Sequence, residues 1–167
     1  MRKYISHAVF VLVALAIGFS LGHFRIFGQA NESSDPMFGT WAMDQSKSVN
    51  NRGGNHAPYL TQSIRILTHE GEGFRMSLAT SPAGAPLVYT GKFDGKDYPD
   101  PRSRRGDETL AHWRATPSVI VRLKKTAGVP SEVVIYTVSL DGGTFVSTSW
   151  DPAHPELEDL QVFHRAK

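Results

Sequence analysis

Five histidines follow residue 30, and histidine is the residue type best suited to bind zinc or to act as a base near neutral pH. They are His56, His69, His112, His154 and His164. No two of them form His-x-x-x-His or His-Glu-x-x-His, the spacings that put two ligands on one helix face. Alternate strand positions could still bring three together, but no spacing argues for it. The sequence therefore predicts no metal site, and His112 and His164 are interpreted as hydrogen-bonded strand residues.

Other catalytic patterns also fail. Asp94, Asp97 and Asp100 have the spacing of a calcium loop, yet its twelfth position holds Arg105 instead of Glu. After residue 30 there is no Gly-x-Ser-x-Gly nucleophile motif. The chain has no Cys, which excludes disulfides and a thiol nucleophile. We therefore nominate no catalytic residue and expect no cofactor.

Charge argues against nucleic acid as a partner. Of the 18 Lys and Arg residues, three lie in residues 1–30, which leaves 15 against 16 acidic residues, a net charge of −1. Arg102, Arg104 and Arg105 form a local basic cluster, interpreted either as a solvated loop or as a patch for an anionic partner.

The first 30 residues read as a targeting segment. Arg2 and Lys3 precede an uncharged, mostly apolar run over residues 8–22, and small residues at 28 and 30 offer a cleavage site. A cleaved signal peptide and a retained hydrophobic helix, anchored through residues 8–27, both fit. Either one predicts an exported protein, periplasmic or extracellular, that meets the membrane only through this segment. Residues 31–36 would be a linker and residues 37–167 the folded domain.

The elements expected in the domain are strands. Nine short runs with alternating apolar and polar residues are separated by Gly, Pro and Asp, as in antiparallel barrels. They cover residues 39–43, 61–70, 74–79, 87–93, 109–115, 119–125, 132–140, 144–150 and 160–164. Short connections favour an up-and-down meander, and we predict an all-β, eight-stranded antiparallel barrel preceded by the N-terminal hydrophobic helix. Asp44 could cap one helical turn or begin an irregular crossing. Residues 49–58 are too rich in Gly and Asn for a regular element.

Two segments carry a family resemblance. Gly39-Thr40-Trp41 resembles the Gly-x-Trp signature of lipocalins, and FGTWAMDQSKS followed by FDGKDYP at Phe93–Pro99 resembles lipocalin-like secreted domains of soil and plant-associated bacteria. The functions of that family are mostly unassigned, so the resemblance implies a fold more than an activity. It also implies that Trp41 closes the barrel floor beside Gly39 and beneath a basic side chain, for which Arg165 is the candidate.

Three functions remain open. The first is a binding module for a small apolar or amphipathic molecule, and its predicted lining is Phe74, Met76, Leu78, Tyr89, Val121 and Tyr136. The second is a filled barrel that acts in the envelope through loops such as 49–58 and 99–107. The third, an enzyme, is the least favoured, because no nucleophile or base is nominated. The sequence does not define the oligomeric state.

Overall fold

The computed structural model describes residues 35–51, 54, 56–59, 61–81 and 85–166. The helical element among them is a single 3₁₀ turn, η2 (Gln45–Lys47), with Asp44 as its N-cap, so the capped turn is the alternative observed. Residues 1–30 lie outside the described residues, and the hydrophobic helix stays a prediction. No helix of the described part has both the length and the apolar character needed to span a membrane.

Nine strands of five or more residues make up the sheet. They are β1 (Gly39–Met43), β4 (Gln62–Glu70), β5 (Gly73–Ser81), β6 (Leu87–Lys92), β8 (Glu108–Thr116), β9 (Val119–Thr126), β10 (Val129–Val138), β11 (Thr144–Asp151) and β12 (His154–Arg165). Three strands of two residues complete it: β2 (Val49–Asn50), β3 (Ala57–Pro58) and β7 (Tyr98–Pro99). Each of the nine predicted runs overlaps one of the longer strands.

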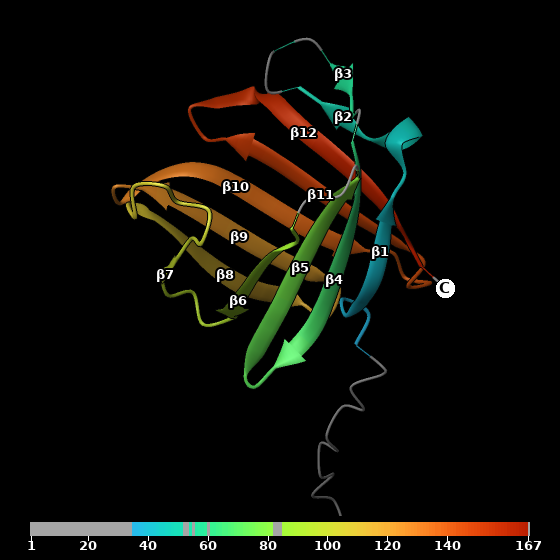
Figure 1. Cartoon of the computed structure of the whole chain (residues 1–167), viewed down its shortest axis with the longest axis horizontal. Coiled ribbons are helices and arrows are strands. Elements are labelled where there is room, and N and C mark those ends of the chain that lie inside the picture. Colours follow the sequence, from blue (N-terminus) through green and yellow to red (C-terminus); the bar gives the residue numbers. More distant parts are fainter. Residues whose placement is uncertain (1–34, 52–53, 55, 60, 82–84, 167) are drawn as a thin grey trace, which may run out of the picture. The chain divides into compact units, whose positions relative to one another are not determined.

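The strands form a nearly closed antiparallel barrel (Figure 1). The hydrogen-bonded order is β6-β5-β4-β1-β12-β11-β10-β9-β8-β7, and the last long strand, β12, returns to pair with the first. This path has ten strands, so the prediction of eight is wrong. The two-residue strand β7 is too short to appear as a run of alternating residues. The sequence also contained nine long runs, one more than the predicted number of strands. At the break between β6 and β7, β6 approaches β8, and the ring of Phe74 lies 4.8 Å from that of His112.

The segment after η2 is also more regular than expected. Val49 pairs with Leu160 of β12, and β2 pairs with β3 through Val49 with Pro58 and Asn50 with Ala57. The expectation that residues 49–58 contain no regular element is therefore wrong. Backbone pairing with β12 supplies order that composition alone does not reveal.

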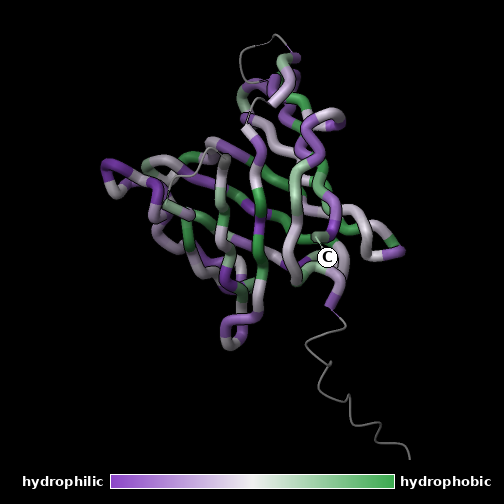
Figure 2. The backbone as a smooth tube through the Cα atoms, turned by 45° about the vertical axis from the view of Figure 1, so that its right-hand side comes forward, coloured by the Kyte–Doolittle hydropathy of each residue, from purple (hydrophilic) through white to green (hydrophobic). Residues whose placement is uncertain are grey.

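Hydrophobic and hydrophilic residues alternate along several of the strands (Figure 2), as expected when successive side chains point to opposite faces of a sheet. The buried core is largely aromatic. Trp41 lies 5.4 Å from Phe145, which in turn stacks 5.6 Å from Tyr136 and packs edge-on against Phe163 at 5.6 Å. These rings fill part of the interior, and a cavity with both apolar and charged walls occupies another part.

Candidate ligand-binding cavity

A cavity of about 150 Å³ lies inside the barrel. One part of its wall is apolar or aromatic and consists of Met76, Leu78, Leu87, Tyr89, Val134 and Tyr136. The other part is charged or polar and includes Arg65, Arg102, Arg122, Glu132, Ser147 and Gln161. Alternation on β4, β9 and β10 aims the charged side chains inward from three separate strands. The inner cavity is therefore amphipathic.

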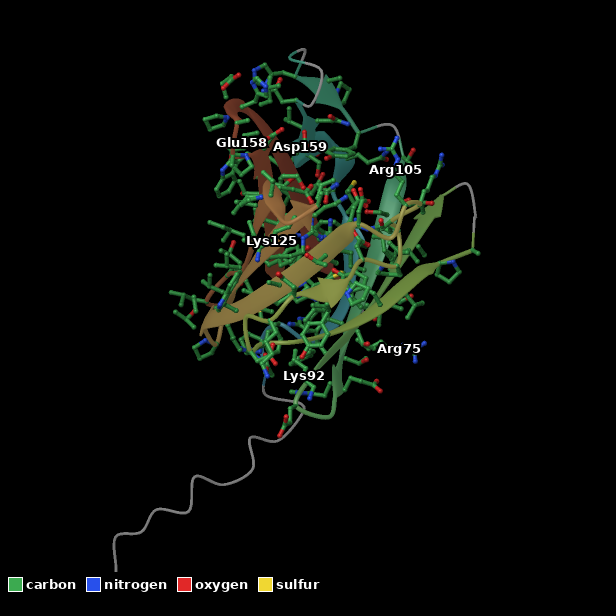
Figure 3. The ribbon with its side chains drawn as sticks, turned by 90° about the vertical axis from the view of Figure 1, so that its left-hand side faces the viewer. Arg75, Lys92, Arg105, Lys125, Glu158 and Asp159 are labelled. Atoms are coloured by element: carbon green, nitrogen blue, oxygen red, sulfur yellow. The ribbon has the colours of Figure 1, made fainter. Side chains whose placement is uncertain are left out.

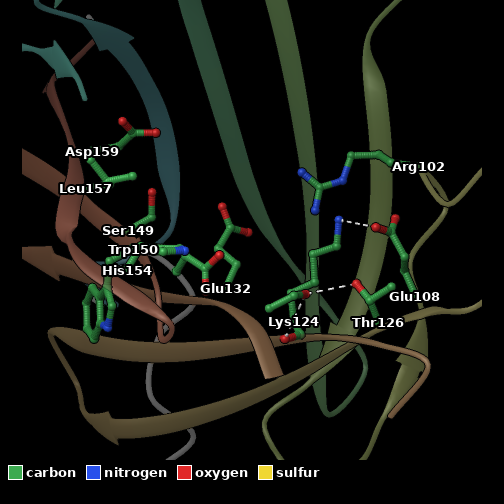
Figure 4. A pocket seen from close by; sticks show the side chains of 12 residues that line it. Arg102, Glu108, Lys124, Thr126, Glu132, Ser149, Trp150, His154, Leu157 and Asp159 are labelled. Atoms are coloured by element: carbon green, nitrogen blue, oxygen red, sulfur yellow. Dashed lines mark hydrogen bonds and ion pairs between the residues drawn. The ribbon is translucent and has the colours of Figure 1, made fainter. Parts of the chain in front are cut away.

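A second, more open pocket of about 370 Å³ adjoins it (Figure 4). The two share Arg102, Glu132 and Ser149 in their walls. The outer pocket combines charged and polar groups with Trp150 and Leu157. Lys124 Nζ lies 2.7 Å from Glu108 Oε1, and Thr126 Oγ1 lies 3.0 Å from Ser131 Oγ. A molecule entering the inner cavity from this side would pass a ring of charged groups.

Arg65 is the most unusual residue of the inner cavity. Its side chain is buried, with 8% of the residue exposed, and its guanidinium carbon lies 4.7 Å from the ring centroid of Phe163 and 5.6 Å from that of Tyr136. Nη2 donates a hydrogen bond to Oε1 of Gln161, while Nε has no hydrogen-bond partner among the described residues. No carboxylate of the described residues forms an ion pair with it. Aromatic faces and an amide thus hold this buried cation.

The other two cavity arginines do have carboxylate partners. Arg122 Nη2 donates to Glu132 Oε2, and Arg102 binds both oxygens of the buried Asp100, at 2.9 Å through Nε and 2.8 Å through Nη2. Burial opposes ionisation of Asp100, but the hydrogen bonds and charge of Arg102 outweigh it and hold the pKa of Asp100 below its ordinary value. Arg65 differs from both, since no carboxylate of the described residues lies within ion-pair distance of it.

Two further groups near the cavity stay neutral. Burial raises the pKa of the Tyr89 hydroxyl, which donates to Met76 Sδ at 3.1 Å. Burial, with smaller contributions from the charges of Arg122 and Arg102, lowers the pKa of His112 from 6.5 to about 3. Neither ring nitrogen of His112 has a hydrogen-bond partner among the described residues, unlike the interpretation made from sequence. His164 does have one, because its Nε2 lies 3.1 Å from Asp44 Oδ2.

Five of the six predicted lining residues lie at the interior. Met76, Leu78, Tyr89 and Tyr136 line the inner cavity. Phe74 is buried beside it, with its ring 6.0 Å from that of Tyr89 in an edge-on contact.

Val121 is placed differently. It does not line the cavity, whereas Ile120 and Arg122 on either side of it are buried. Val121 pairs with Trp113 of β8 and with Ile135 of β10, and Trp113 is 40% exposed. The prediction that Val121 faces inward is therefore wrong. β9 turns Arg122 and Lys124 inward together with Ile120, whereas Val119 and Val121 lie on the opposite face.

The sequence also failed to single out Arg65, Arg122 and Gln161 as cavity residues. On β4 the same inversion applies, since Ile64 and Ile66 are each 40% exposed while Ser63 and Arg65 are buried. The available signal was the alternation itself, which groups Arg65 with Ser63 and Arg122 with Lys124. It does not reveal which face turns inward.

Gly39, Trp41 and Arg165 meet at the other predicted site. Trp41 is fully buried, and the guanidinium carbon of Arg165 lies 4.1 Å from its ring centroid. Arg165 also donates to three backbone carbonyls, those of Pro36, Phe38 and Gly142, at 2.8 to 2.9 Å. Gly39 has φ +146°, and a Cβ there would lie 2.3 Å from Arg165 Nη1. The positive φ favours glycine, and a side chain at this position would displace the guanidinium of Arg165.

Comparison of the sequence with known protein families and with characterised proteins finds no match. The fold does match solved structures. One is a Schistosoma mansoni fatty acid binding protein in complex with arachidonic acid, with a TM-score of 0.60, 15% identity, and coverage of 79% of this chain and 97% of that one. Another is Echinococcus granulosus fatty-acid-binding protein 1, with a TM-score of 0.58, 16% identity, and coverage of 79% and 98%.

A third similar structure is secretory abundant heat soluble protein 4 from Ramazzottius varieornatus, with a TM-score of 0.62, 9% identity, and coverage of 80% of this chain and 96% of that one. At these identities the likeness shows the fold alone. The chain has the barrel architecture that these proteins share.

Proposed function

We propose that this protein binds a small apolar or amphipathic molecule inside its barrel and does not transform it. The observation that carries the proposal is the inner cavity of about 150 Å³, whose wall is apolar on one part and cationic on another. The similarity in fold to two fatty acid binding proteins supports it. Export through residues 1–30, and membership of the secreted lipocalin-like family that the sequence resembles, are parts of the same proposal.

The test is ligand-observed NMR with small neutral probes. Saturation transfer from the protein to benzyl alcohol and to indole should be seen in the wild type. Ser147→Phe should abolish it, because Ser147 is buried and lines the inner cavity. Thr148→Phe is the matched control, since the next residue of β11 lies on the opposite face. Absence of transfer in the wild type, or equal transfer in both variants, would contradict interior binding.

A filled barrel that acts through its loops is the second candidate function. The observation that favours it is an open hollow of about 350 Å³ whose lining includes Arg102, Arg104 and Arg105 as well as Asp107 and Glu108. Arg104 and Arg105 are exposed and could meet an anionic partner. The double variant Arg104→Glu/Arg105→Glu should then lose a partner that the wild type recovers by pull-down, and neither protein should show saturation transfer to the neutral probes.

A further inference from the structure

The three arginines that line the inner cavity differ in their ionic partners. Arg122 is paired with Glu132, and Arg102 is paired with Asp100. Arg65 has the side-chain amide of Gln161 and three aromatic rings, but no carboxylate of the described residues within ion-pair distance. Removing a charge from water without a counter-charge is strongly unfavourable. An anionic group beside Arg65 would supply the counter-charge that this residue lacks among the described residues.

The guanidinium of Arg65 is also held in position. The rings of Phe163, Tyr136 and Phe145 lie 4.7, 5.6 and 5.9 Å from its central carbon. Only one of its nitrogens, Nη2, makes a hydrogen bond within the described residues, and Nε has no partner there. A planar guanidinium with free donors matches a carboxylate in geometry as well as charge.

The size of the inner cavity limits what can accompany that carboxylate. Its volume of about 150 Å³ is comparable to that of a protein cavity that takes up one benzene molecule. Tyr89, Tyr136 and Met76 supply flat and polarizable surfaces in its wall. One aromatic ring fits this space, whereas a long alkyl chain would extend out of it.

Beyond the inner cavity an alkyl chain would meet charged groups. The adjoining outer pocket contains the Lys124–Glu108 ion pair and the carboxylates of Asp159 and Glu132 (Figure 4). Covering these groups with methylene groups would remove water from charges and offer no hydrogen bond in return. A polar substituent on the ring could instead be accommodated there.

We infer that the barrel selects a small monoanionic acid with a single aromatic ring, bound with its carboxylate at Arg65, and disfavours long-chain fatty acids. The inference rests on the proposed function, because it names the ligand class of the same cavity. It separates this chain from the fatty acid binding proteins whose fold it shares.

Isothermal titration calorimetry at pH 7 with three probes tests it: benzoate, the neutral analogue benzyl alcohol, and palmitate. Benzoate should bind at least about tenfold more tightly than benzyl alcohol, the ratio expected for one charge-assisted interaction. Palmitate should bind more weakly than benzoate. Arg65→Met should reduce the affinity for benzoate to that for benzyl alcohol.

Two variants complete the design. Arg75→Gln removes an equal charge from the exposed face of β5, where Arg75 points away from the barrel (Figure 3), and should leave the affinity for benzoate unchanged. Arg65→Lys should keep part of the preference for benzoate, and it decides the matter if Arg65→Met does not fold. Equal affinities of the wild type for benzoate and benzyl alcohol, or tighter binding of palmitate, would overturn the inference and leave interior binding intact. Binding of none of the three probes would overturn both proposals.

Discussion

The guanidinium of Arg165, next to the last described residue, lies 4.1 Å from the ring centroid of Trp41 in the first strand. The two residues are also Cα partners in the pairing of β1 with β12. Arg165 adds hydrogen bonds to carbonyls of Pro36, Phe38 and Gly142, so one side chain joins the chain entry to β1, the β10–β11 turn and the end of β12. This contact therefore links the first and the last strand of the barrel, β1 and β12.

Arg165→Met should lower the free energy of unfolding by about 1–2 kcal/mol, because it removes a cation–π contact and three hydrogen bonds from a partly solvated site. Arg165→Lys keeps the charge but cannot reach all three carbonyls, and its loss should be intermediate. Urea denaturation measures both. A change below about 0.5 kcal/mol in Arg165→Met, the range typical of neutral surface substitutions, would contradict the account of this contact.

Gly39→Ala should cost about 1–3 kcal/mol of stability, since φ +146° is unfavourable for alanine and the new methyl group would meet Arg165. Gly106→Ala is the matched control. Gly106 also has a positive φ, +74°, but a methyl group added there would have no other heavy atom within 4 Å. Gly39→Ala should cost more than Gly106→Ala, because the greater backbone strain at φ +146° and the steric conflict with Arg165 both act at position 39. A smaller loss in Gly39→Ala than in Gly106→Ala would exclude that conflict.

Stability should fall as the pH drops below 6.5, partly because of His112. Its pKa is about 3 in the folded protein, against an ordinary value of 6.5 in an unfolded chain, so between these values only the unfolded chain binds the proton. The corresponding loss is about 1.4 kcal/mol per pH unit. His112→Leu should flatten the dependence between pH 6.5 and about 4.5 in chemical denaturation, whereas the exposed His154→Gln should not. Parallel curves for wild type and His112→Leu would contradict a buried neutral histidine.

Arg65→Met, in the absence of ligand, should be as stable as the wild type or more stable. The substitution removes a buried cation that lacks a carboxylate partner among the described residues and retains most of its apolar stem. Arg122→Met provides the contrast, because it breaks the buried ion pair with Glu132 and should cost about 3 kcal/mol. Thermal and urea unfolding of both variants measure this. A loss as large in Arg65→Met as in Arg122→Met would show that Arg65 is structurally required.

Much of the fold was predictable from the sequence. Alternation and turn residues located every long strand, and Asp141-Gly142 marks the hairpin between β10 and β11, where Gly143 N donates to Asp141 Oδ1. The alternation of residues did not reveal how many strands the nearly closed barrel contains. The two residues of β7 pair with β8 through Tyr98 and Pro99, and a pair of residues is too short to show a period.

The inward face was the harder problem. Apolar residues usually mark the interior, and this rule placed Tyr89 and Tyr136 correctly because both are buried. It failed for Val121, since β9 uses Arg122 and Lys124 to line the cavity and pockets. On β4 and β9, Arg65 and Arg122 are buried while Ile64 and Ile66 are partly exposed, which reverses the pattern on which the rule depends. Only the pairing register, which the sequence does not contain, decides between the two faces.

The central claim is that a small molecule occupies the barrel interior, and a crystal structure with 4-bromobenzoate tests it most directly. The account predicts an anomalous bromine peak inside the cavity near Tyr89 and Tyr136, with the carboxylate beside Arg65. A bromine peak confined to the outer surface, or an interior filled by side chains with no ligand density, would contradict it.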